Sequence, residues 1–378
     1  MKIVCDDKIP FLRGVLEPYA QVVYLPGAKT TSEVVKDADA VITRTRTICN
    51  ESLLKGSRVK VIATATIGYD HIDTQWCEDA GIVWRNAPGC NSWSVKQYIA
   101  SVLVSLARRH GLDLSAMTIG VVGVGNVGSK VAEIASLLGM KVLLNDPPRE
   151  RTEGSAAFVS LETLMEQADI ITLHVPLTKE GEDATWHLFD RERIARLKTS
   201  QFLFNSSRGP VVDNAALRDA LKEGAIRGAV LDVWENEPDI DRELMNLLEY
   251  ATPHIAGYSA DGKANGTTSS VRTVASVLGL PLTDWTASGV PAPRQDLSFT
   301  VDATGRSLQE VLTEAILYTY DVQTDTDDLR NAPETFEKLR GDYPVRREPT
   351  AFTLKLVGGT PQEAEILKKI GFKLTNND

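Results

Sequence analysis

The sequence predicts an α/β protein built on a doubly wound parallel sheet, with a second α/β unit before it and a small α+β segment after it. Three observations lead to this prediction. A glycine-rich turn links a short apolar run to a helical run within residues 118–146. Segments with strand and helix patterns alternate on both sides of that stretch. The composition then changes after about residue 280, where Pro281, Pro291 and Pro293 indicate a linker.

Residues 1 to about 95 form the first predicted unit, a flavodoxin-like parallel sheet. Short β-branched runs alternate there with helical segments. Ligands of such sheets gather at the carboxyl ends of the strands, which singles out the loops at 44–47 and 64–70. The expected strands are Lys2–Cys5, Val22–Leu25, Ala40–Thr43, Val59–Ala65 and Ile82–Arg85, and the expected helices are Phe11–Tyr19, Thr31–Val35, Glu51–Leu54 and Thr74–Asp79.

The glycine-rich turn has the G-x-G-x-x-G spacing of a dinucleotide site, with Gly123, Gly125 and Gly128 in the three positions. An expected strand, Thr118–Val122, precedes it, and an expected helix, Val127–Leu138, follows it. The first glycine permits a tight turn, the second lets a pyrophosphate approach the backbone, and the third lets helix and strand pack closely. The start of the helix offers free N–H groups to phosphates.

The next expected strand, Val142–Leu144, leads directly to Asn145 and Asp146. A carboxylate at this place accepts hydrogen bonds from the ribose hydroxyls of the cofactor and repels a 2′-phosphate. The stretch from strand to acid therefore predicts NAD rather than NADP.

Strands and helices continue to alternate as far as residue 256, which brings the second sheet to six strands, the number in a full doubly wound dinucleotide fold. We expect residues 1–95 with 257–285 to form a discontinuous substrate-binding lid, 96–256 the NAD domain and 286–378 a C-terminal dimerisation domain. The remaining expected strands are Asp169–Leu173, Gln201–Asn205, Arg227–Asp232, Ala251–Pro253, Ala351–Val357 and Phe372–Leu374, and the remaining expected helices are Ser92–Arg109, Leu161–Gln167, Arg191–Leu197, Asn214–Glu223, Thr267–Leu278, Ser307–Tyr318 and Pro361–Ile370.

Composition narrows the functional class. The chain carries 41 basic and 51 acidic residues, a net charge of −10, which argues against a nucleic-acid or anionic-membrane surface. No apolar run is long enough to cross a bilayer, and the N-terminal residues lack the pattern of a signal peptide. The four cysteines lack metal-site spacing. We expect a cytoplasmic protein with reduced thiols and no metal site.

Three loops that follow strands of the second sheet carry reactive side chains, namely Arg208, Glu237 and His254. Carboxyl ends of parallel strands lie at one edge of a sheet, so these side chains can meet around one substrate atom. An arginine can grip a carboxylate with two hydrogen bonds, and a histidine can take a hydroxyl proton as hydride leaves the carbon. A glutamate can hold the imidazole in one tautomer. The pattern predicts oxidation of a 2-hydroxy acid.

With these residues in view, the chain resembles the D-isomer-specific 2-hydroxyacid dehydrogenases, and most closely their erythronate-4-phosphate dehydrogenase branch. The resemblance covers roughly residues 40–270, and the length and the extra C-terminal segment match too. Thr45 stands where the family more often has Ser, and Asn265 where it more often has Arg. The shared stretches are ATATIGYDHID, APGCN, GVVGVGNVG, NDPPR, NSSRGPVVDN, LDVWENEP and ATPHIAGYSADGKANGTT.

The resemblance implies roles for individual residues. Arg208, Glu237 and His254 match the catalytic positions of the family, with His254 as acid and base. Thr45, Thr66 and Tyr258 match substrate contacts. The cofactor contacts fall on Asn126, Val127, Asp146, Val175, Asp232 and Gly257, to which we add Ser206, Ser207 and the glycines at 123, 125 and 128.

The implied reaction is the NAD-dependent oxidation of 4-phospho-D-erythronate to (3R)-3-hydroxy-2-oxo-4-phosphooxybutanoate in pyridoxal 5′-phosphate biosynthesis, by a homodimer. Residue patterns alone lead only to a 2-hydroxy acid. Two alternatives therefore stay open. One is another member of the family, such as a phosphoglycerate dehydrogenase. The other is an NAD-sensing binding protein without catalysis, against which the intact catalytic residues argue.

A phosphate on the substrate is suggested by Arg44 and Arg46, two cations that flank Thr45 at a strand end. Solvated surface arginines explain the pair equally well. Arg346 and Arg347, in the C-terminal segment, are weaker candidates for the phosphate because they could equally pair with Glu348.

Overall fold

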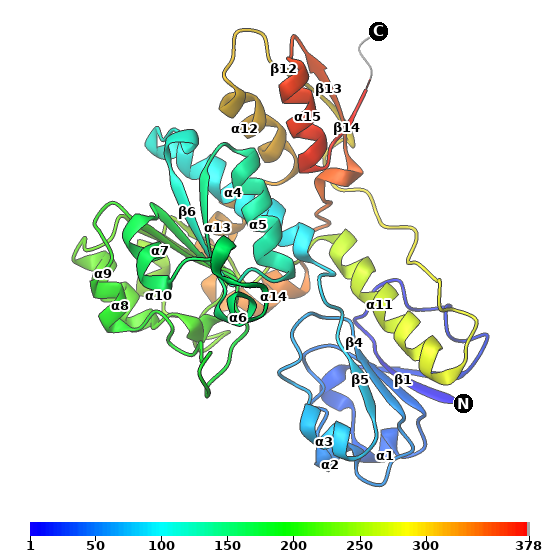
Figure 1. The fold of residues 1–378 in the computed structure, drawn as a ribbon. Coiled ribbons are helices and arrows are strands. Elements are labelled where there is room, and N and C mark those ends of the chain that lie inside the picture. The colour runs from blue at the N-terminus through cyan, green and yellow to red at the C-terminus, as the bar shows by residue number, and fades with distance from the viewer. Residues whose placement is uncertain (376–378) are drawn as a thin grey trace. The chain divides into compact units, whose positions relative to one another are not determined.

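Two compact units make up the chain in the computed structural model, which describes residues 1–375 (Figure 1). The first contains Met1–Asn91 and Ser259–Pro291, and the second contains Ser92–Tyr258 and the chain from Ala292 on. The chain therefore leaves the first unit, returns to it after residue 258 and leaves it again. The C-terminal segment, for which we expected a separate domain over 286–378, belongs to the second unit.

A parallel five-stranded sheet of order β2-β1-β3-β4-β5 forms the centre of the first unit. This is the flavodoxin-like order, as expected from the sequence. Apolar clusters cover both of its faces because neighbouring residues of a strand point to opposite sides, as Ile3 and Val4 do in β1. The elements are β1 (Lys2–Asp6), β2 (Gln21–Leu25), β3 (Ala40–Thr43), β4 (Val61–Thr64), β5 (Val83–Arg85), α1 (Ser32–Val35), α2 (Glu51–Leu54), α3 (Thr74–Asp79) and α11 (Ala260–Leu278).

The helix expected over Phe11–Tyr19 is wrong, since these residues form a series of turns. Leu12 and Leu16 are fully buried, and their spacing of four mimics a helical face. Phe11 and Gly14 have φ values of +62° and +83°, which a right-handed helix does not contain. The buried leucines therefore mark contacts of a folded loop.

A six-stranded parallel sheet of order β11-β10-β9-β8-β6-β7 forms the centre of the second unit, which confirms the predicted doubly wound fold and its six strands. The chain reverses its direction of travel across the sheet between β6 and β8, and ligands bind at such switch points. The strands are β6 (Thr118–Val122), β7 (Lys141–Asn145), β8 (Ile170–Leu173), β9 (Phe202–Asn205), β10 (Gly228–Leu231) and β11 (Tyr250–Ala251), and the helices are α4 (Ser92–His110), α5 (Asn126–Leu137), α6 (Pro147–Glu153), α7 (Leu161–Gln167), α8 (Arg191–Ala195), α9 (Asn214–Lys222) and α10 (Arg242–Leu247).

The C-terminal segment adds a parallel three-stranded sheet of order β12-β13-β14, against which α12 and α15 pack (Figure 1). Its closing strand–helix–strand and its first helix follow the sequence prediction, whereas β12, α13 and α14 were not predicted. The elements are β12 (Ser298–Asp302), β13 (Thr353–Val357), β14 (Lys373–Leu374), α12 (Leu308–Thr319), α13 (Val322–Asn331), α14 (Phe336–Gly341) and α15 (Pro361–Ile370). Short 3₁₀ turns lie at Gly27–Lys29, Leu114–Ala116, Ser155–Ala157, Gly209–Val211, Pro333–Thr335 and Pro349–Ala351.

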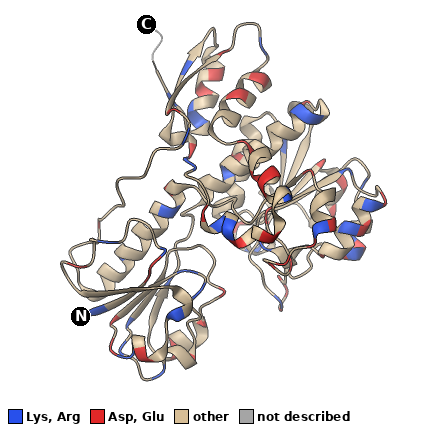
Figure 2. Ribbon diagram, turned by 180° about the vertical axis from the view of Figure 1, so that it is seen from behind, with Lys and Arg blue, Asp and Glu red and all other residues tan. Residues whose placement is uncertain are grey.

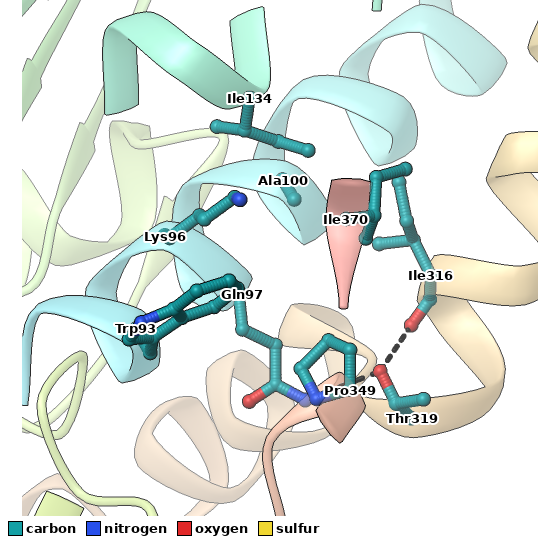
Figure 3. Close-up of a pocket in the computed structure, with 9 residues that line it drawn as sticks. All are labelled: Trp93, Lys96, Gln97, Ala100, Ile134, Ile316, Thr319, Pro349 and Ile370. Carbon is teal, nitrogen blue, oxygen red and sulfur yellow. Dashed lines mark hydrogen bonds between the residues drawn. The ribbon is translucent and has the colours of Figure 1, made fainter. Parts of the chain in front are cut away.

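Helix α4 joins the two parts of the second unit. Most of its residues are buried, including polar ones that bond to the C-terminal segment. The amide nitrogen of Gln97 donates to the Thr319 hydroxyl at 3.1 Å, and the Ser101 hydroxyl accepts from the backbone N–H of Val322 at 3.0 Å. A cavity of about 10 Å³, room for about one water molecule, lies where α4, α5, α12 and α15 meet Pro349. Figure 3 shows the residues that line it. Paired polar groups thus hold the C-terminal segment in place.

Charge is distributed without a single dominant sign. Figure 2 shows acidic and basic residues interspersed along the helices of the second unit. Among the described helices, none is both long and apolar enough to span a bilayer. The described residues also contain no group of three or more His, Cys, Asp or Glu side chains able to hold a metal ion.

Candidate active site

The glycine turn between β6 and α5 has the features that a bound pyrophosphate requires. Gly123 adopts φ +82°, and a Cβ there would lie 2.8 Å from the His174 backbone. A Cβ on Gly128 would lie 1.9 Å from the carbonyl oxygen of Gly123, so only glycine lets α5 come this close. A Cβ on Gly125 would meet no protein atom within 4 Å. The backbone at Gly125 therefore faces open space, where a phosphate can approach.

Asp146 follows β7 and reaches the glycine turn. Its Oδ2 accepts a hydrogen bond from the backbone N–H of Val124 at 2.7 Å, and its Oδ1 accepts from the N–H of Arg149 at 3.1 Å, which caps α6. The guanidinium of Arg149 pairs with Glu153 at 2.7 Å. The carboxylate is thus held beside the turn, while Arg149, three residues later, already has an acidic partner.

The other predicted cofactor contacts also lie at the carboxyl edge of the second sheet or at the start of α5. Residues at strand ends of one parallel sheet share an edge, so this distribution fits a dinucleotide laid across the switch point. Asn126 and Val127 begin the twelve-residue helix α5, whose free N–H groups suit phosphates. The remaining predicted contacts are Val175 after β8, Ser206 and Ser207 after β9, Asp232 after β10 and Gly257 after β11.

The loop after β9 carries Arg208. The Asn205 side chain organises it, because its Oδ1 accepts from the N–H of Ser207 at 3.0 Å and its amide donates to the carbonyl of Arg208 at 2.8 Å. A Cβ on Gly209 would lie 1.9 Å from the carbonyl oxygen of Trp234. Only glycine therefore lets this loop pack directly on the loop that follows β10. Arg208 is held beside the segment that carries Glu237.

Glu237 and His254 form a hydrogen-bonded pair, with 2.8 Å between Oε2 and Nδ1. The other oxygen of Glu237 accepts from the backbone N–H of Trp234 at 2.9 Å. Burial alone would raise the pKa of Glu237, but the hydrogen bond and the charge of His254, with the Trp234 N–H, hold this pKa below its usual range. The glutamate therefore stays ionised and fixes the imidazole through Nδ1, which leaves Nε2 for a substrate proton.

The turn that carries His254 is held by Asp232, whose carboxylate is fully buried. Its Oδ1 accepts from the Thr252 hydroxyl and from the N–H of Ile255, both at 2.7 Å, and its Oδ2 accepts from the N–H of Ala256 at 2.9 Å. Burial raises the pKa of Asp232. The carboxylate thus organises the His254 turn, a function that the sequence did not reveal.

His174, a second histidine at the same sheet edge, is less suited to proton transfer. Its Nε2 lies 2.9 Å from the Thr172 hydroxyl, and loss of solvent lowers the pKa of His174 to about 3. The imidazole is therefore neutral, and its hydrogen bond ties it to β8.

The predicted substrate contacts are divided between the two units. Thr66 belongs to the first unit and donates its hydroxyl to the carbonyl of Gly68 at 2.8 Å. In the same unit, Arg44 donates to the carbonyl of Lys8 at 3.3 Å. Arg46 lines a shallow polar cleft, and Thr45, which lies between the two arginines in sequence, does not. The other lining residues are Gly27, Ala28, Thr30, Thr31, Ser32, Ile48, Asn50, Ser52 and Leu53.

Tyr258 belongs to the second unit and contacts the C-terminal segment. Arg340 of α14 donates to its hydroxyl at 3.1 Å, and Tyr343 packs edge-on against its ring. Arg346 is fully buried and donates to backbone carbonyls, so it is not placed as a surface site for a phosphate. The sequence did not single out Arg340, and it suggested Arg346 only for the phosphate, because both arginines contact residues more than eighty positions earlier in the chain.

Two protein-family models match the chain. The first is described as the NAD binding domain of D-isomer specific 2-hydroxyacid dehydrogenases and matches residues 84–256. The second is a domain of unknown function and matches residues 293–371. The first match includes the glycine turn and all three predicted catalytic residues.

Curated relatives match over almost the whole chain. The chain is 51% identical to an erythronate-4-phosphate dehydrogenase of Bacteroides fragilis, over 94% of this chain and 99% of the relative. It is 41% identical to an erythronate-4-phosphate dehydrogenase of Proteus mirabilis, over the full length of both. The match to the Proteus mirabilis enzyme includes the whole C-terminal segment.

Solved structures show the same fold. A D-lactate dehydrogenase from Aquifex aeolicus, complexed with NAD and lactic acid, is 28% identical with a TM-score of 0.63 and covers 77% of this chain and all of its own. The pyruvate reductase of Chlamydomonas reinhardtii is 26% identical with a TM-score of 0.58 and covers 75% of this chain and 98% of its own.

Proposed function

The chain belongs to the erythronate-4-phosphate dehydrogenase family of D-isomer-specific 2-hydroxyacid dehydrogenases, and we propose from this premise how its residues carry out the reaction. It is an NAD-dependent oxidoreductase. The proposed reaction converts 4-phospho-D-erythronate and NAD⁺ into (3R)-3-hydroxy-2-oxo-4-phosphooxybutanoate, NADH and a proton, a step in the synthesis of vitamin B6.

The observation that carries the proposal is the Glu237–His254 pair, with 2.8 Å between Oε2 and Nδ1. In our proposal, Nε2 of His254 accepts the proton of the substrate C2 hydroxyl and returns it in the reverse direction. Glu237 holds the imidazole in the required tautomer and balances the charge of the imidazolium. When bound, NAD⁺ supplies the acceptor for the hydride that leaves C2.

Arg208 completes the proposed catalytic group. Its guanidinium can bind the substrate carboxylate through two hydrogen bonds and polarise the oxygen on C2. The packing of Gly209 against Trp234 supports this role because it fixes the arginine loop beside the loop of Glu237. The three side chains follow β9, β10 and β11, which are neighbours in the sheet.

The glycine turn, the start of α5 and Asp146 would hold the cofactor. Asp146 accepts hydrogen bonds through both of its oxygens and adds negative charge beside the turn, which disfavours a 2′-phosphate. Thr45, Thr66 and Tyr258 are the proposed substrate contacts, and Arg44 and Arg46 supply the proposed positive charge for the phosphate.

The deciding experiment measures NADH formation by absorbance with purified protein, NAD⁺ and 4-phospho-D-erythronate, beside 3-phosphoglycerate and D-lactate. Selective turnover of phosphoerythronate supports the proposal. Turnover of another hydroxy acid would agree with the assigned catalytic residues but would show that the substrate is a different one. Arg44 and Arg46 would then be ordinary surface residues. Because retained NADH could stall turnover, the assay is repeated with a 2-oxo acid that reoxidises the cofactor.

The main rivals are a phosphoglycerate dehydrogenase and an NAD-sensing protein. Substrate profiling separates the first. For the second, NADH would bind but no hydroxy acid would be oxidised in either assay. The Glu237–His254 pair favours the enzyme because a sensor has no use for a proton relay.

We also propose that the protein is a cytoplasmic homodimer that pairs through its C-terminal segment. The dimer is proposed from the family. The cytoplasmic location is supported by the four cysteines, all of which are free thiols in the described residues. A sedimentation mass of one chain at working concentrations would overturn the dimer.

A further inference from the structure

We infer that Arg346, in the C-terminal segment, is a positioning residue that holds the His254 turn in its catalytic conformation. This inference rests on the proposed role of His254. It gives the C-terminal segment, which a family model of unknown function matches, a part in shaping the active site.

The His254 turn has a backbone conformation that needs support. His254 has φ +57°, in the left-handed region that residues other than glycine rarely adopt. Such conformations persist only where the surrounding structure determines them. The two residues that follow, Ile255 and Ala256, are almost completely buried. Water cannot satisfy their peptide groups, so protein atoms must do so.

Two charged side chains hold these two residues from opposite sides. Asp232 accepts from the N–H groups of Ile255 and Ala256, at 2.7 and 2.9 Å. Arg346 donates one terminal nitrogen to both of their carbonyl oxygens, at 3.1 and 2.6 Å. Every peptide group of the pair is therefore bound by a charged group. The turn is fixed between the end of β10 and the C-terminal segment.

Arg346 is itself held rigidly. Its guanidinium lies 4.5 Å from the centre of the Tyr320 ring and donates to the hydroxyl of Tyr343 at 3.3 Å. The carboxylate of Asp325 accepts from the hydroxyls of both tyrosines at 2.7 Å. Arg346 is 4% exposed, so its position is determined by packing as well as by hydrogen bonds. Through this rigid donor, residues of α13 help to fix the conformation of the turn.

The geometry distinguishes arginine from lysine at this position. A guanidinium presents several N–H groups in a fixed plane, which lets it bind two adjacent carbonyls and a hydroxyl together. An ammonium on a flexible stem keeps the charge but not this arrangement. Arg346→Lys therefore tests positioning, while it leaves the buried charge in place.

The experiment compares Arg346→Lys with Leu367→Ala, which opens a space in the core of α15 without touching the turn. We expect Arg346→Lys to lower kcat about 10- to 100-fold and to leave NADH binding within about threefold, as expected when a positioned catalytic group is misplaced. Leu367→Ala should lower the Tm but leave kcat within about twofold below that temperature. Equal losses of kcat in the two variants would overturn the inference, because they would show that Arg346 only stabilises the fold.

A double-mutant cycle with His254→Ala sharpens the test. If Arg346 acts through His254, then Arg346→Lys should change the residual rate of His254→Ala by less than about twofold. The same fold-loss in both backgrounds would overturn the inference, because a purely structural effect does not depend on which side chain occupies position 254.

Amide hydrogen exchange gives a readout that needs no turnover. The N–H groups of Ile255 and Ala256 should exchange at least about tenfold faster in Arg346→Lys than in the wild type, and at the wild-type rate in Leu367→Ala. Unchanged exchange in Arg346→Lys would overturn the inference. Failure of the proposed reaction would leave this result unaffected, so the two failures can be told apart. If Arg346→Lys does not fold, Arg346→Met with Asp325→Asn removes both buried charges together and carries the same expectations.

Discussion

Nδ1 of His254 lies 2.8 Å from Oε2 of Glu237, and the second oxygen of the same glutamate accepts from the backbone N–H of Trp234 at 2.9 Å. The imidazole is thereby anchored to a carboxylate whose own orientation is fixed by the backbone. Such an anchor fixes the tautomer of the neutral ring and leaves the other ring nitrogen for chemistry.

Replacement of the imidazole should abolish proton transfer. We expect His254→Ala to lower kcat by about 10²- to 10⁴-fold, the usual contribution of a general acid or base. NADH binding, followed by fluorescence titration, should survive. His187→Ala is a matched control, because His187 also contacts a glutamate of the second unit, with 2.8 Å between its Nε2 and Oε1 of Glu235. Wild-type turnover in His254→Ala would disprove the acid–base assignment.

Neutralising the carboxylate should affect both rate and stability. We expect Glu237→Gln to lower kcat by about 10²-fold or more, because the imidazole loses its tautomer and its charge partner. The pKa of Glu237 is lowered in the folded protein, so its contribution to stability is present above the unfolded-state pKa and disappears as pH falls through the folded-state pKa.

Denaturant titrations of wild type and Glu237→Gln at several pH values test the second part. The difference between their free energies of unfolding should be largest near neutral pH and should shrink as the solution becomes acidic. A difference that grew on acidification would mean that Glu237 is not stabilised in its ionised form.

Substitutions at two glycines of the turn should have different effects, one on the stability of the fold and the other on cofactor binding. Gly128→Ala places a Cβ 1.9 Å from a carbonyl oxygen and should destabilise the fold by about 1–3 kcal/mol or more. Gly125→Ala meets no protein atom within 4 Å and has a permitted φ of −73°. The Gly125→Ala variant should have the Tm of the wild type but a lower affinity for NADH. Calorimetry with and without NADH measures both effects, and a normal affinity in Gly125→Ala would show that no phosphate approaches there.

Asp146 should determine which cofactor is preferred. We expect Asp146→Ser to reduce the preference for NAD over NADP by about tenfold or more, equivalent to about 1.4 kcal/mol, because the repulsion of a 2′-phosphate is lost. Serine can still cap α6. Asp190→Ser, at the cap of α8, controls for the loss of a capping carboxylate and should leave the preference unchanged. The measurement is kcat/KM with each cofactor.

The proposed function of Arg208 should require the planar shape of its guanidinium as well as its charge. We expect Arg208→Lys to raise KM for the hydroxy acid and to lower kcat/KM by about 10²-fold, because an ammonium cannot form the paired hydrogen bonds to a carboxylate. NADH affinity should change little. A loss confined to NADH binding would mean that Arg208 serves the cofactor rather than the substrate.

Much of the fold and of the candidate site could be predicted because the relevant patterns are local. The two sheets were predicted from short β-branched runs, whose alternation with helices depends on neighbouring residues. Gly123, Gly125 and Gly128 were assigned separate tasks from their spacing, and the geometry at each glycine agrees with its task. Arg208, Glu237 and His254 were chosen because each follows a strand. In the structure those strands are adjacent.

The sequence predictions failed or were incomplete for residues whose contacts come from distant parts of the chain. Leu12 and Leu16 have helical spacing, but they are buried by a loop that turns at Phe11 and Gly14. The sequence predicts the helix at Ser92–Arg109 but not its neighbours, because the polar residues of α4 are buried against a segment more than two hundred residues later.

Local patterns of residues were enough to predict the dinucleotide turn, the acid that follows it and the three side chains of the proposed reaction, because turn geometry and strand periodicity act over a few residues. The folded structure was needed to show that the carboxylate of Asp232 and the guanidinium of Arg346 both bind the turn after His254. A buried peptide group needs a partner, but nothing nearby in the chain specifies which one. Packing brings Arg346 to Ala256 across ninety residues.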